Sequence, residues 1–174
     1  MRNQFYKQRS DFELSAIERD KTQVMPEGVS VQTDIPYMND GDKAHRMDVY
    51  RPEGSESTTL PVVINIHGGG LLIGSKEFNR FFCAKLSRLG YLVFSIEYRL
   101  VPDCMVFDQF SDVCNAFKYI NAHLGEYNGD SNHIYGVADS GGAYLLTYTA
   151  AMAKNRELAR SEEHTSELQS LRHL

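Results

Sequence analysis

Two short, almost wholly apolar runs, Pro61–Ile66 and Tyr91–Ile96, limit the folds open to this chain. Apolar runs without polar alternation are typical of strands buried on both faces of a parallel sheet. A helix is predicted after each run, over 79–89 and 106–124, because apolar residues recur there at helical spacing and a glycine follows. A further strand, His133–Ala138, continues the alternation, with another helix after it. This order predicts an α/β fold on a mostly parallel sheet.

The helices at 79–89 and 106–124 are amphipathic, so each should turn one apolar face toward the sheet. In the first helix we expect that face to carry Phe82, Leu86 and Leu89. In the second helix the corresponding residues are Phe107, Phe110, Val113, Phe117 and Ile120.

Two alternating segments, Val29–Pro36 and His45–Tyr50, precede the first apolar run. The turn-forming sequence Asn-Asp-Gly-Asp lies between them, so they are predicted to form a leading antiparallel hairpin. Residues 1–27 are polar with helical stretches and are predicted to form an N-terminal arm or cap. No repeat or linker interrupts 28–159, which we interpret as one domain.

Composition excludes several classes of protein. The chain is 42% hydrophobic and 24% charged, as in an ordinary globular protein. A net charge of −5 without any basic run argues against nucleic acid or an anionic membrane as a partner. The polar start has no apolar core of a signal peptide, and no apolar run is long enough to span a membrane, so a cytoplasmic location is expected.

Three cysteines, Cys83, Cys104 and Cys114, follow no metal-binding spacing. Their odd number favours small buried thiols in a reducing compartment over disulfides. The sequence therefore predicts no metal and no cofactor.

The tetrapeptide His67-Gly68-Gly69-Gly70 follows the first apolar strand directly. Glycines without side chains leave backbone N–H groups free to turn toward a ligand. Donors held in this way can stabilise the oxyanion of a tetrahedral intermediate. The alternative is a flexible connection between a strand and a helix.

A second motif, Ala138-Asp139-Ser140-Gly141-Gly142, lies between a predicted strand and an apolar helix. In this context it matches the sharp turn called a nucleophile elbow, in which small residues flank an exposed serine. The helix that follows would favour negative charge developing at its N-terminus. The alternative is a serine that only caps a helix.

With these two motifs the chain resembles the hormone-sensitive-lipase-like esterases of the α/β-hydrolase superfamily. The resemblance runs from about 61 to 153 and includes the Tyr-Arg-Leu-Val-Pro-Asp segment at 98–103. It departs from the family pattern mildly, with Ala138 in place of glycine and Gly141 in place of alanine.

This resemblance implies a serine esterase for small esters with short acyl chains, with Ser140 as the catalytic nucleophile. It also implies that the N–H groups of Gly68, Gly69 and Gly141 form the oxyanion hole. Motif support would come from His67, Gly70 and Asp139, with Asp139 holding the elbow. Arg99 would hold its own loop. Nothing in it indicates an oligomeric state.

Other patterns are assigned structural roles. The sequence Asp-Ser-Gly-Gly also marks trypsin-like proteases, but those are all-β proteins and this chain alternates strands with long helices. Asp108 and Asp112 lie one helical turn apart and are expected on a solvated helix face. His45, His123 and His133 have no ligand-spaced partners and are expected at the surface.

The triad acid and base that a serine hydrolase needs cannot be assigned in this chain. In this superfamily the order is serine, then Asp or Glu, then His. Glu157 or Glu162 followed by His164 fits that order, but a continuous helix would place His164 roughly 36 Å from Ser140. The triad Asp and His are therefore predicted to be absent.

The tail offers a reason. Residues 160–170 read as the translation of a common sequencing-library adapter, and 171–174 are compatible with its continuation. We therefore interpret 160–174 as an artefact attached to a truncated α/β-hydrolase domain, and expect the chain itself to be inactive. A non-catalytic small-molecule binder of the same fold is the alternative function.

Overall fold

In the computed structural model, residues 2–154 are described. The helices are α1 (Arg2–Asp20), α2 (Arg80–Arg88), α3 (Val106–His123) and α4 (Ser140–Lys154). Two short 3-10 helices are η1 (Lys76–Asn79) and η2 (Leu124–Tyr127). The strands are β1 (Val29–Pro36), β2 (Arg46–Pro52), β3 (Leu60–Ile66), β4 (Leu92–Ile96) and β5 (Gly129–Ala138). The predicted tail artefact, with Glu157, Glu162 and His164, lies outside these residues.

The strands form one mixed sheet in the order β1-β2-β4-β3-β5. As predicted, β1 and β2 pair antiparallel, and β3, β4 and β5 are parallel. In the sheet, β3 lies between β4 and β5. The antiparallel hairpin joins the parallel strands because β2 pairs with β4. The central strands are almost fully buried, as their continuous apolar runs require.

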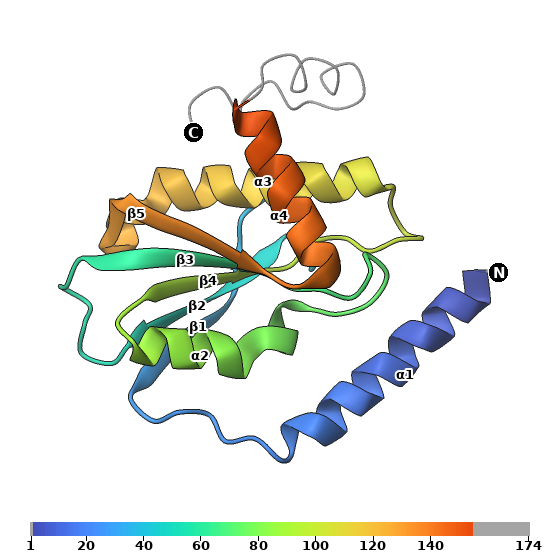
Figure 1. Ribbon diagram of the computed structural model, residues 1–174, viewed down its shortest axis with the longest axis horizontal. Helices are drawn as coiled ribbons and strands as arrows, with labels where there is room; N and C mark the ends of the chain where they lie inside the picture. The colour runs from blue at the N-terminus through green and yellow to red at the C-terminus, as the bar shows by residue number, and fades with distance from the viewer. Residues whose placement is uncertain (1, 155–174) are drawn as a thin grey trace.

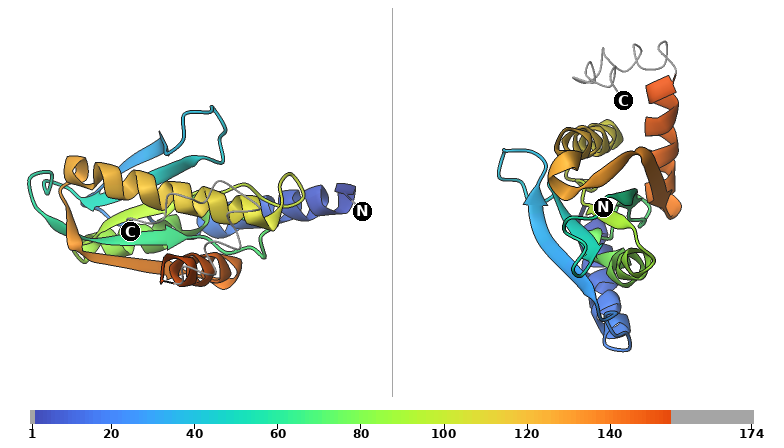
Figure 2. Two further views of the ribbon diagram at one scale, coloured as in Figure 1. Left: turned by 90° about the horizontal axis from the view of Figure 1, so that it is seen from above. Right: turned by 90° about the vertical axis from the view of Figure 1, so that its left-hand side faces the viewer.

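Helices cover both faces of the sheet (Figures 1 and 2). One face packs against α3 and α4 in the larger apolar core, and the other packs against α2 in a smaller one. The prediction for the buried face of this helix holds for Leu86, which packs against the smaller core, but is wrong for Phe82 and for Leu89, the residue after α2, which are both exposed. The buried residues of α2 are Phe81 and three small residues, Cys83, Ala84 and Ser87, so large apolar side chains alone do not identify the packed face.

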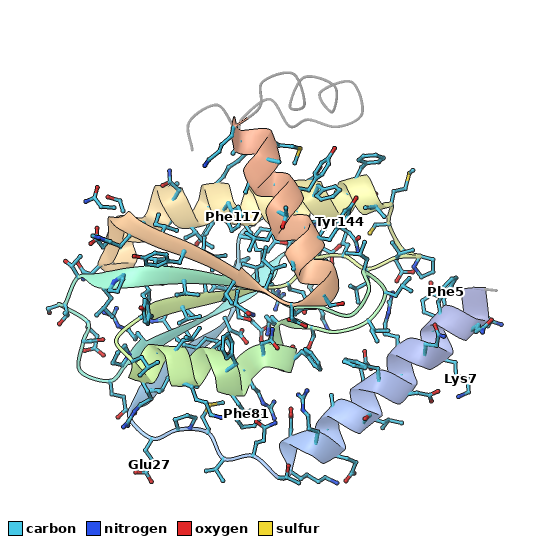
Figure 3. All side chains as sticks on the ribbon, in the orientation of Figure 1. Phe5, Lys7, Glu27, Phe81, Phe117 and Tyr144 are labelled. Carbon is cyan, nitrogen blue, oxygen red and sulfur yellow. The ribbon has the colours of Figure 1, made fainter. Side chains whose placement is uncertain are left out.

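The N-terminal helix α1 lies apart from the sheet, along the loops that follow β3 and β4 (Figure 1). Arg9 fastens it there by donating to the carbonyl oxygens of Leu72 (3.1 Å) and Val101 (2.9 Å) and by pairing with Asp103 (2.8 Å). Lys7 points into solvent from the opposite side of the helix (Figure 3). Within residues 2–154, no helix is both long and apolar enough to cross a membrane.

Candidate active site at the elbow and the glycine loop

The elbow occupies the sharp turn between β5, which ends at Ala138, and α4, which begins at Ser140. Ser140 is exposed and has a φ of 47°, a left-handed conformation that costs a non-glycine residue about 1–3 kcal/mol. The turn can be this tight because Gly142 lies directly against the carbonyl groups of Ile66 and His67. A Cβ at Gly142 would lie 2.9 Å from the His67 carbonyl carbon and closer still to both oxygens. The serine is thus presented above the sheet at the end of β5.

The glycine loop lies against this elbow. Gly69 and Gly70 have φ angles of 121° and 59°, and the following Leu71 also lies in the left-handed region, at 68°. A Cβ at Gly141 would lie 3.1 Å from the Gly70 nitrogen and 3.0 Å from the Leu71 nitrogen. The glycine loop therefore packs directly against the elbow at the residue after Ser140.

One predicted oxyanion donor is already engaged. The Gly68 N–H donates to Asp139 Oδ1 (3.1 Å), and Asn79 Nδ2 donates to the same oxygen (2.9 Å). An N–H bound to a carboxylate is not free for a substrate oxygen, so this hydrogen bond weighs against the predicted oxyanion role of Gly68. Its hydrogen bond instead ties the start of the glycine loop to the elbow through Asp139.

His67 is fully buried beneath the loop, stacked on the Tyr98 ring with 4.3 Å between centroids. Its Nδ1 lies 2.8 Å from the Gly68 carbonyl oxygen, and its Nε2 lies 2.8 Å from Glu97 Oε1. Burial alone would lower the pKa of His67, but the charge and hydrogen bond of Glu97 outweigh it and raise that pKa. With one ring nitrogen beside the Gly68 carbonyl and the other beside Glu97, His67 is not available as a base.

A chain of hydrogen-bonded polar side chains runs from the elbow at the surface to buried residues of the sheet. Asn79 Nδ2 donates to Asn65 Oδ1 on β3 (3.2 Å) as well as to Asp139. Asn65 Nδ2 donates to Ser95 Oγ on β4 (3.0 Å), and Ser95 Oγ donates to the Lys76 carbonyl oxygen (2.9 Å). The buried Lys76 ammonium ends the chain among the carboxylates of Asp34, Asp48 and Glu77.

A second buried network overturns two expectations. Asp112 is only 1% exposed and His45 only 3%, although both were predicted at the surface. Arg99 Nε donates to Asp112 Oδ2 (2.9 Å), and His45 Nε2 lies 3.0 Å from Asp112 Oδ1. His45 Nδ1 lies 2.6 Å from Asp40 Oδ2. The network joins the hairpin, the loop after β4 and α3.

Sequence reasoning missed this network although a signal was present. Asp112 lies three residues after Gln109 and four before Ala116, at the helical spacing of a buried face. Arg99 also follows a buried strand closely, where its charge needs a partner. The two observations together would have indicated a buried Arg–Asp pair.

The remaining predicted residues hold other positions. His133 is exposed, as predicted, and pairs with Asp130, whereas His123 is half-buried and stacked on Tyr119. Cys83 and Cys114 are buried free thiols, and burial raises their pKa values to about 12 and about 11. Within residues 2–154 no group of side chains could hold a metal ion, and no histidine bonds to Ser140.

Comparison with known proteins places this geometry in a family. The model of the BD-FAE family matches residues 47–173. Among curated proteins, the probable isoprenylcysteine alpha-carbonyl methylesterase ICMEL1 of Arabidopsis thaliana is 31% identical over 60% of this chain and 22% of its own length. The probable carboxylic ester hydrolase LipM of Mycobacterium tuberculosis is 31% identical over 66% of this chain and 28% of its own.

Solved structures give the same fold. Esterase B from Lactobacillus rhamnosis superposes with a TM-score of 0.86 at 26% identity, over 91% of this chain and 50% of the esterase. The Pyrobaculum calidifontis esterase gives a TM-score of 0.74 at 32% identity, over 88% of this chain and 49% of the esterase. The chain thus spans about half of these structures and about a quarter of the curated relatives. The resemblance to hormone-sensitive-lipase-like α/β hydrolases is confirmed, and the chain belongs to the BD-FAE family.

Proposed function

We propose that the whole protein is a carboxylic-ester hydrolase in which Ser140 is the nucleophile. The observation that carries this proposal is the strained φ of 47° at Ser140, because the left-handed conformation presents the hydroxyl at the helix end beside the loop amides. Strain at an exposed serine has no packing purpose and is characteristic of functional residues. Names of several relatives, esterases and methylesterases, agree with this chemistry.

In the proposed reaction, Ser140 Oγ attacks the ester carbonyl carbon while a base takes its proton. The negative charge that develops on the carbonyl oxygen is held by the N–H groups of Gly69, Gly70 and Gly141. Gly70 replaces Gly68 in this set because its nitrogen lies close to Gly141, whereas the Gly68 N–H is bound to Asp139. The leaving alkoxide takes the proton from the base, and water then releases the acid from Ser140.

Within residues 2–154 no side chain is placed to act as that base, since His67 is held by Glu97 and His45 by two aspartates. The base and its orienting acid are therefore proposed to belong to a longer protein. The 174-residue chain is proposed to lack activity of its own. Its division into an N-terminal arm, an incomplete hydrolase domain and an artefact at 160–174 remains a prediction.

Small esters with short acyl chains are the proposed substrates. Esterase B of Lactobacillus rhamnosis was captured with a tributyrin phosphonate, which mimics a four-carbon acyl ester. A cytoplasmic location also stays a prediction.

The test compares two proteins in hydrolysis of p-nitrophenyl butyrate. The 174-residue chain should release p-nitrophenol no faster than its Ser140→Ala variant. A longer product that carries residues 1–159 and the rest of the hydrolase domain should turn over, and Ser140→Ala should reduce its kcat by at least about 10⁴-fold. Turnover by the longer product that survives Ser140→Ala would refute the assignment of the nucleophile.

A non-catalytic small-molecule binder is the second candidate. The observation in its favour is that no described histidine bonds to Ser140. A longer product that binds butyrate esters by calorimetry but never releases p-nitrophenol would support the binder over the esterase.

A further inference from the structure

Gln109 of α3 places a polar amide in the interior of the chain. Its side chain is fully buried, although glutamine is mostly a surface residue. Within residues 2–154, Gln109 Oε1 has no hydrogen-bond partner. A buried oxygen without a partner lowers stability, and an apolar side chain of the same shape would avoid that loss. Packing alone therefore does not account for a glutamine at this position.

The amide nitrogen of Gln109 binds two loops. It donates to the Leu71 carbonyl oxygen (2.9 Å), at the end of the glycine loop, and to the Arg99 carbonyl oxygen (2.7 Å), in the loop after β4. Both neighbours are acceptors, so the nitrogen of the amide and not its oxygen must face them. Gln109 thus joins α3 to the loops that follow β3 and β4.

The Leu71 carbonyl oxygen is held from two sides, because it accepts from the Val101 N–H (3.0 Å) as well as from Gln109. A carbonyl oxygen has two lone pairs, so these two donors saturate it. Leu71 has a φ of 68°, a left-handed conformation that persists in a residue with a side chain only where the surroundings enforce it. The two hydrogen bonds provide a restraint of that kind.

The conformation of Leu71 bears on the elbow. The Leu71 nitrogen lies 3.0 Å from the position of a Cβ at Gly141, the first residue after the proposed nucleophile. Gly69 and Gly70, which directly precede Leu71, carry two of the proposed oxyanion donors. Rotation of Leu71 out of the left-handed region would turn the peptide between Gly70 and Leu71 and reorient the loop beside the elbow.

We propose that Gln109 is a positioning residue for the glycine loop. Its amide holds the Leu71 carbonyl, and the loop N–H groups thereby stay directed at the ester oxygen in the transition state. This inference rests on the proposed function, because only that function assigns the loop to the oxyanion hole. Gln109 is buried and acts through Leu71, yet a displacement of catalytic groups by about 1 Å can lower the rate by about 100-fold.

The first test uses the longer product that carries residues 1–159 and the rest of the hydrolase domain. Gln109→Met keeps the length of the side chain and removes both hydrogen bonds. It should lower kcat for p-nitrophenyl butyrate by roughly 10-fold to 100-fold and change KM by less than about 3-fold, because oxyanion contacts strengthen in the transition state. A loss that falls on KM alone would overturn the proposal.

Ser87→Ala is the matched control. Ser87 is also fully buried, and in the described part of the chain its Oγ likewise has no partner. It lies on α2, which covers the face of the sheet opposite to α3. Both variants remove a buried oxygen without a partner, so both should keep the far-UV circular dichroism spectrum of the parent. Ser87→Ala should keep kcat within about 2-fold, and an equal loss of kcat in both variants would overturn the proposal.

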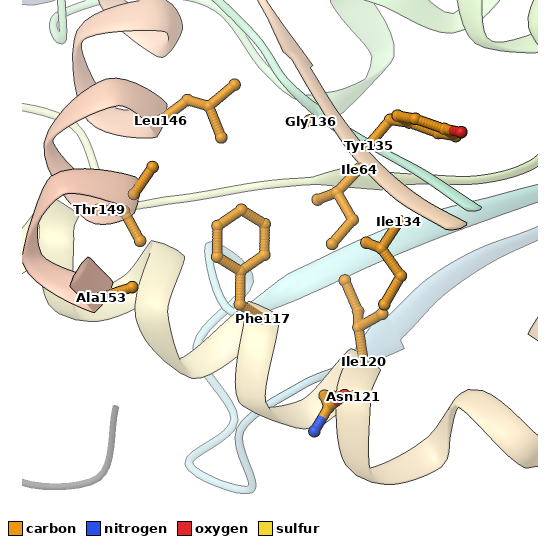
Figure 4. Close-up of a pocket in the computed structure, with 11 residues that line it drawn as sticks. Ile64, Phe117, Ile120, Asn121, Ile134, Tyr135, Gly136, Leu146, Thr149 and Ala153 are labelled. Atoms are coloured by element: carbon orange, nitrogen blue, oxygen red, sulfur yellow. The ribbon is translucent and has the colours of Figure 1, made fainter. Parts of the chain in front are cut away.

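Hydrogen exchange in the 174-residue chain tests the same contact without catalysis. The Leu72 and Ile73 N–H groups both donate to the Gly69 carbonyl oxygen (3.1 Å each), so their exchange reports whether the turn that ends the loop stays closed. Gln109→Met should speed both at least about 10-fold and leave the Ile64 amide unchanged. Ile64 belongs to β3, with its side chain in the apolar groove between α3, α4 and β5 (Figure 4). Unchanged exchange at Leu72 and Ile73 would overturn the proposal.

The two tests separate this inference from the proposed function. A longer parent product that hydrolyses no ester would refute the esterase, while faster exchange in Gln109→Met would still support the anchoring of the loop by Gln109. Faster exchange with an unchanged kcat would overturn the positioning role and leave the esterase intact. Gln109→Leu replaces Gln109→Met if that variant fails to fold. Failure of both to fold would overturn the proposal, since the whole fold and not the loop would then depend on the amide.

Discussion

Replacing Gly142 with alanine should destabilise the chain, because Gly142 is where the first turn of α4 touches the end of β3. The added Cβ would lie 2.9 Å from the His67 carbonyl carbon and closer to the carbonyl oxygens of Ile66 and His67. Unstrained contacts between carbon atoms lie at about 3.5–4.0 Å. The helix or the strand would therefore have to move by roughly 1 Å.

Neither neighbour can rotate away, because the three nearest atoms are backbone atoms of the last residue of β3 and of the residue after it. Overpacking of this kind costs about 1–3 kcal/mol, and a backbone clash belongs near the upper end. Alanine regains up to about 1 kcal/mol because it favours a helix over glycine. The net loss is about 2 kcal/mol, which at about 2–4 °C per kcal/mol lowers Tm by about 4–8 °C.

Thermal unfolding followed by far-UV circular dichroism measures this loss. The matched control is Gly125→Ala in η2, where no atom lies within 4 Å of the added Cβ. Gly125→Ala should leave Tm unchanged or raise it slightly, because alanine restricts the unfolded chain. If Gly142→Ala melts within about 1 °C of the parent, or if both variants lose Tm equally, close approach is not the reason for glycine at this position.

Three further changes test other parts of the structure. Ser140→Gly should raise the free energy of unfolding in urea by about 1 kcal/mol by relieving the left-handed strain, whereas Ser140→Ala should not; equal stability of the two variants would contradict the strain. The pKa of His67 is raised in the folded chain, so protonation of His67 stabilises the fold. This contribution to the free energy of unfolding is complete below the unfolded pKa of about 6.5 and is lost as pH rises through the folded pKa. Urea titrations from pH 6 to pH 9 should show that decline, and Glu97→Gln should flatten it; identical slopes would show that Glu97 does not hold the imidazolium. Arg99→Met should cost about 2 kcal/mol in the same assay, below the usual 3–5 kcal/mol for breaking a buried pair because the arginine is a third exposed and Asp112 keeps His45. A loss under about 0.5 kcal/mol would instead show that the pair of Arg99 and Asp112 stabilises the fold no more than a surface ion pair does.

Most of the fold could be predicted because its signals are local. The runs that became β3 and β4 are apolar without interruption, and the turn sequence before β2 indicates a hairpin whatever surrounds it. The elbow could be predicted equally well, because a turn of small residues between a strand and an apolar helix can be recognised without reference to distant residues. These features depend on backbone conformation, which is determined largely by residues close together in the sequence.

Interactions between distant elements were predicted less well. The placement of Asp112 and His45 at the surface failed because each is buried only through a partner that another element supplies. The same limit applied to the glycine loop. Gly68 looks equivalent to Gly70 in sequence, and only the hydrogen bond from its N–H to Asp139, 71 residues away, distinguishes it.

The hydrogen bond between Asn65 and Ser95 also solves a problem of alignment. These two residues are direct partners in the register of β3 with β4, within strands whose other side chains are nearly all apolar. Apolar strands can slide past each other with little change in burial, so hydrophobicity alone leaves their alignment poorly determined. A shift of two residues would break this hydrogen bond and leave the buried Asn65 Nδ2 without its acceptor, at about 1–3 kcal/mol. This one polar pair therefore favours a single register of the two central strands over shifted registers.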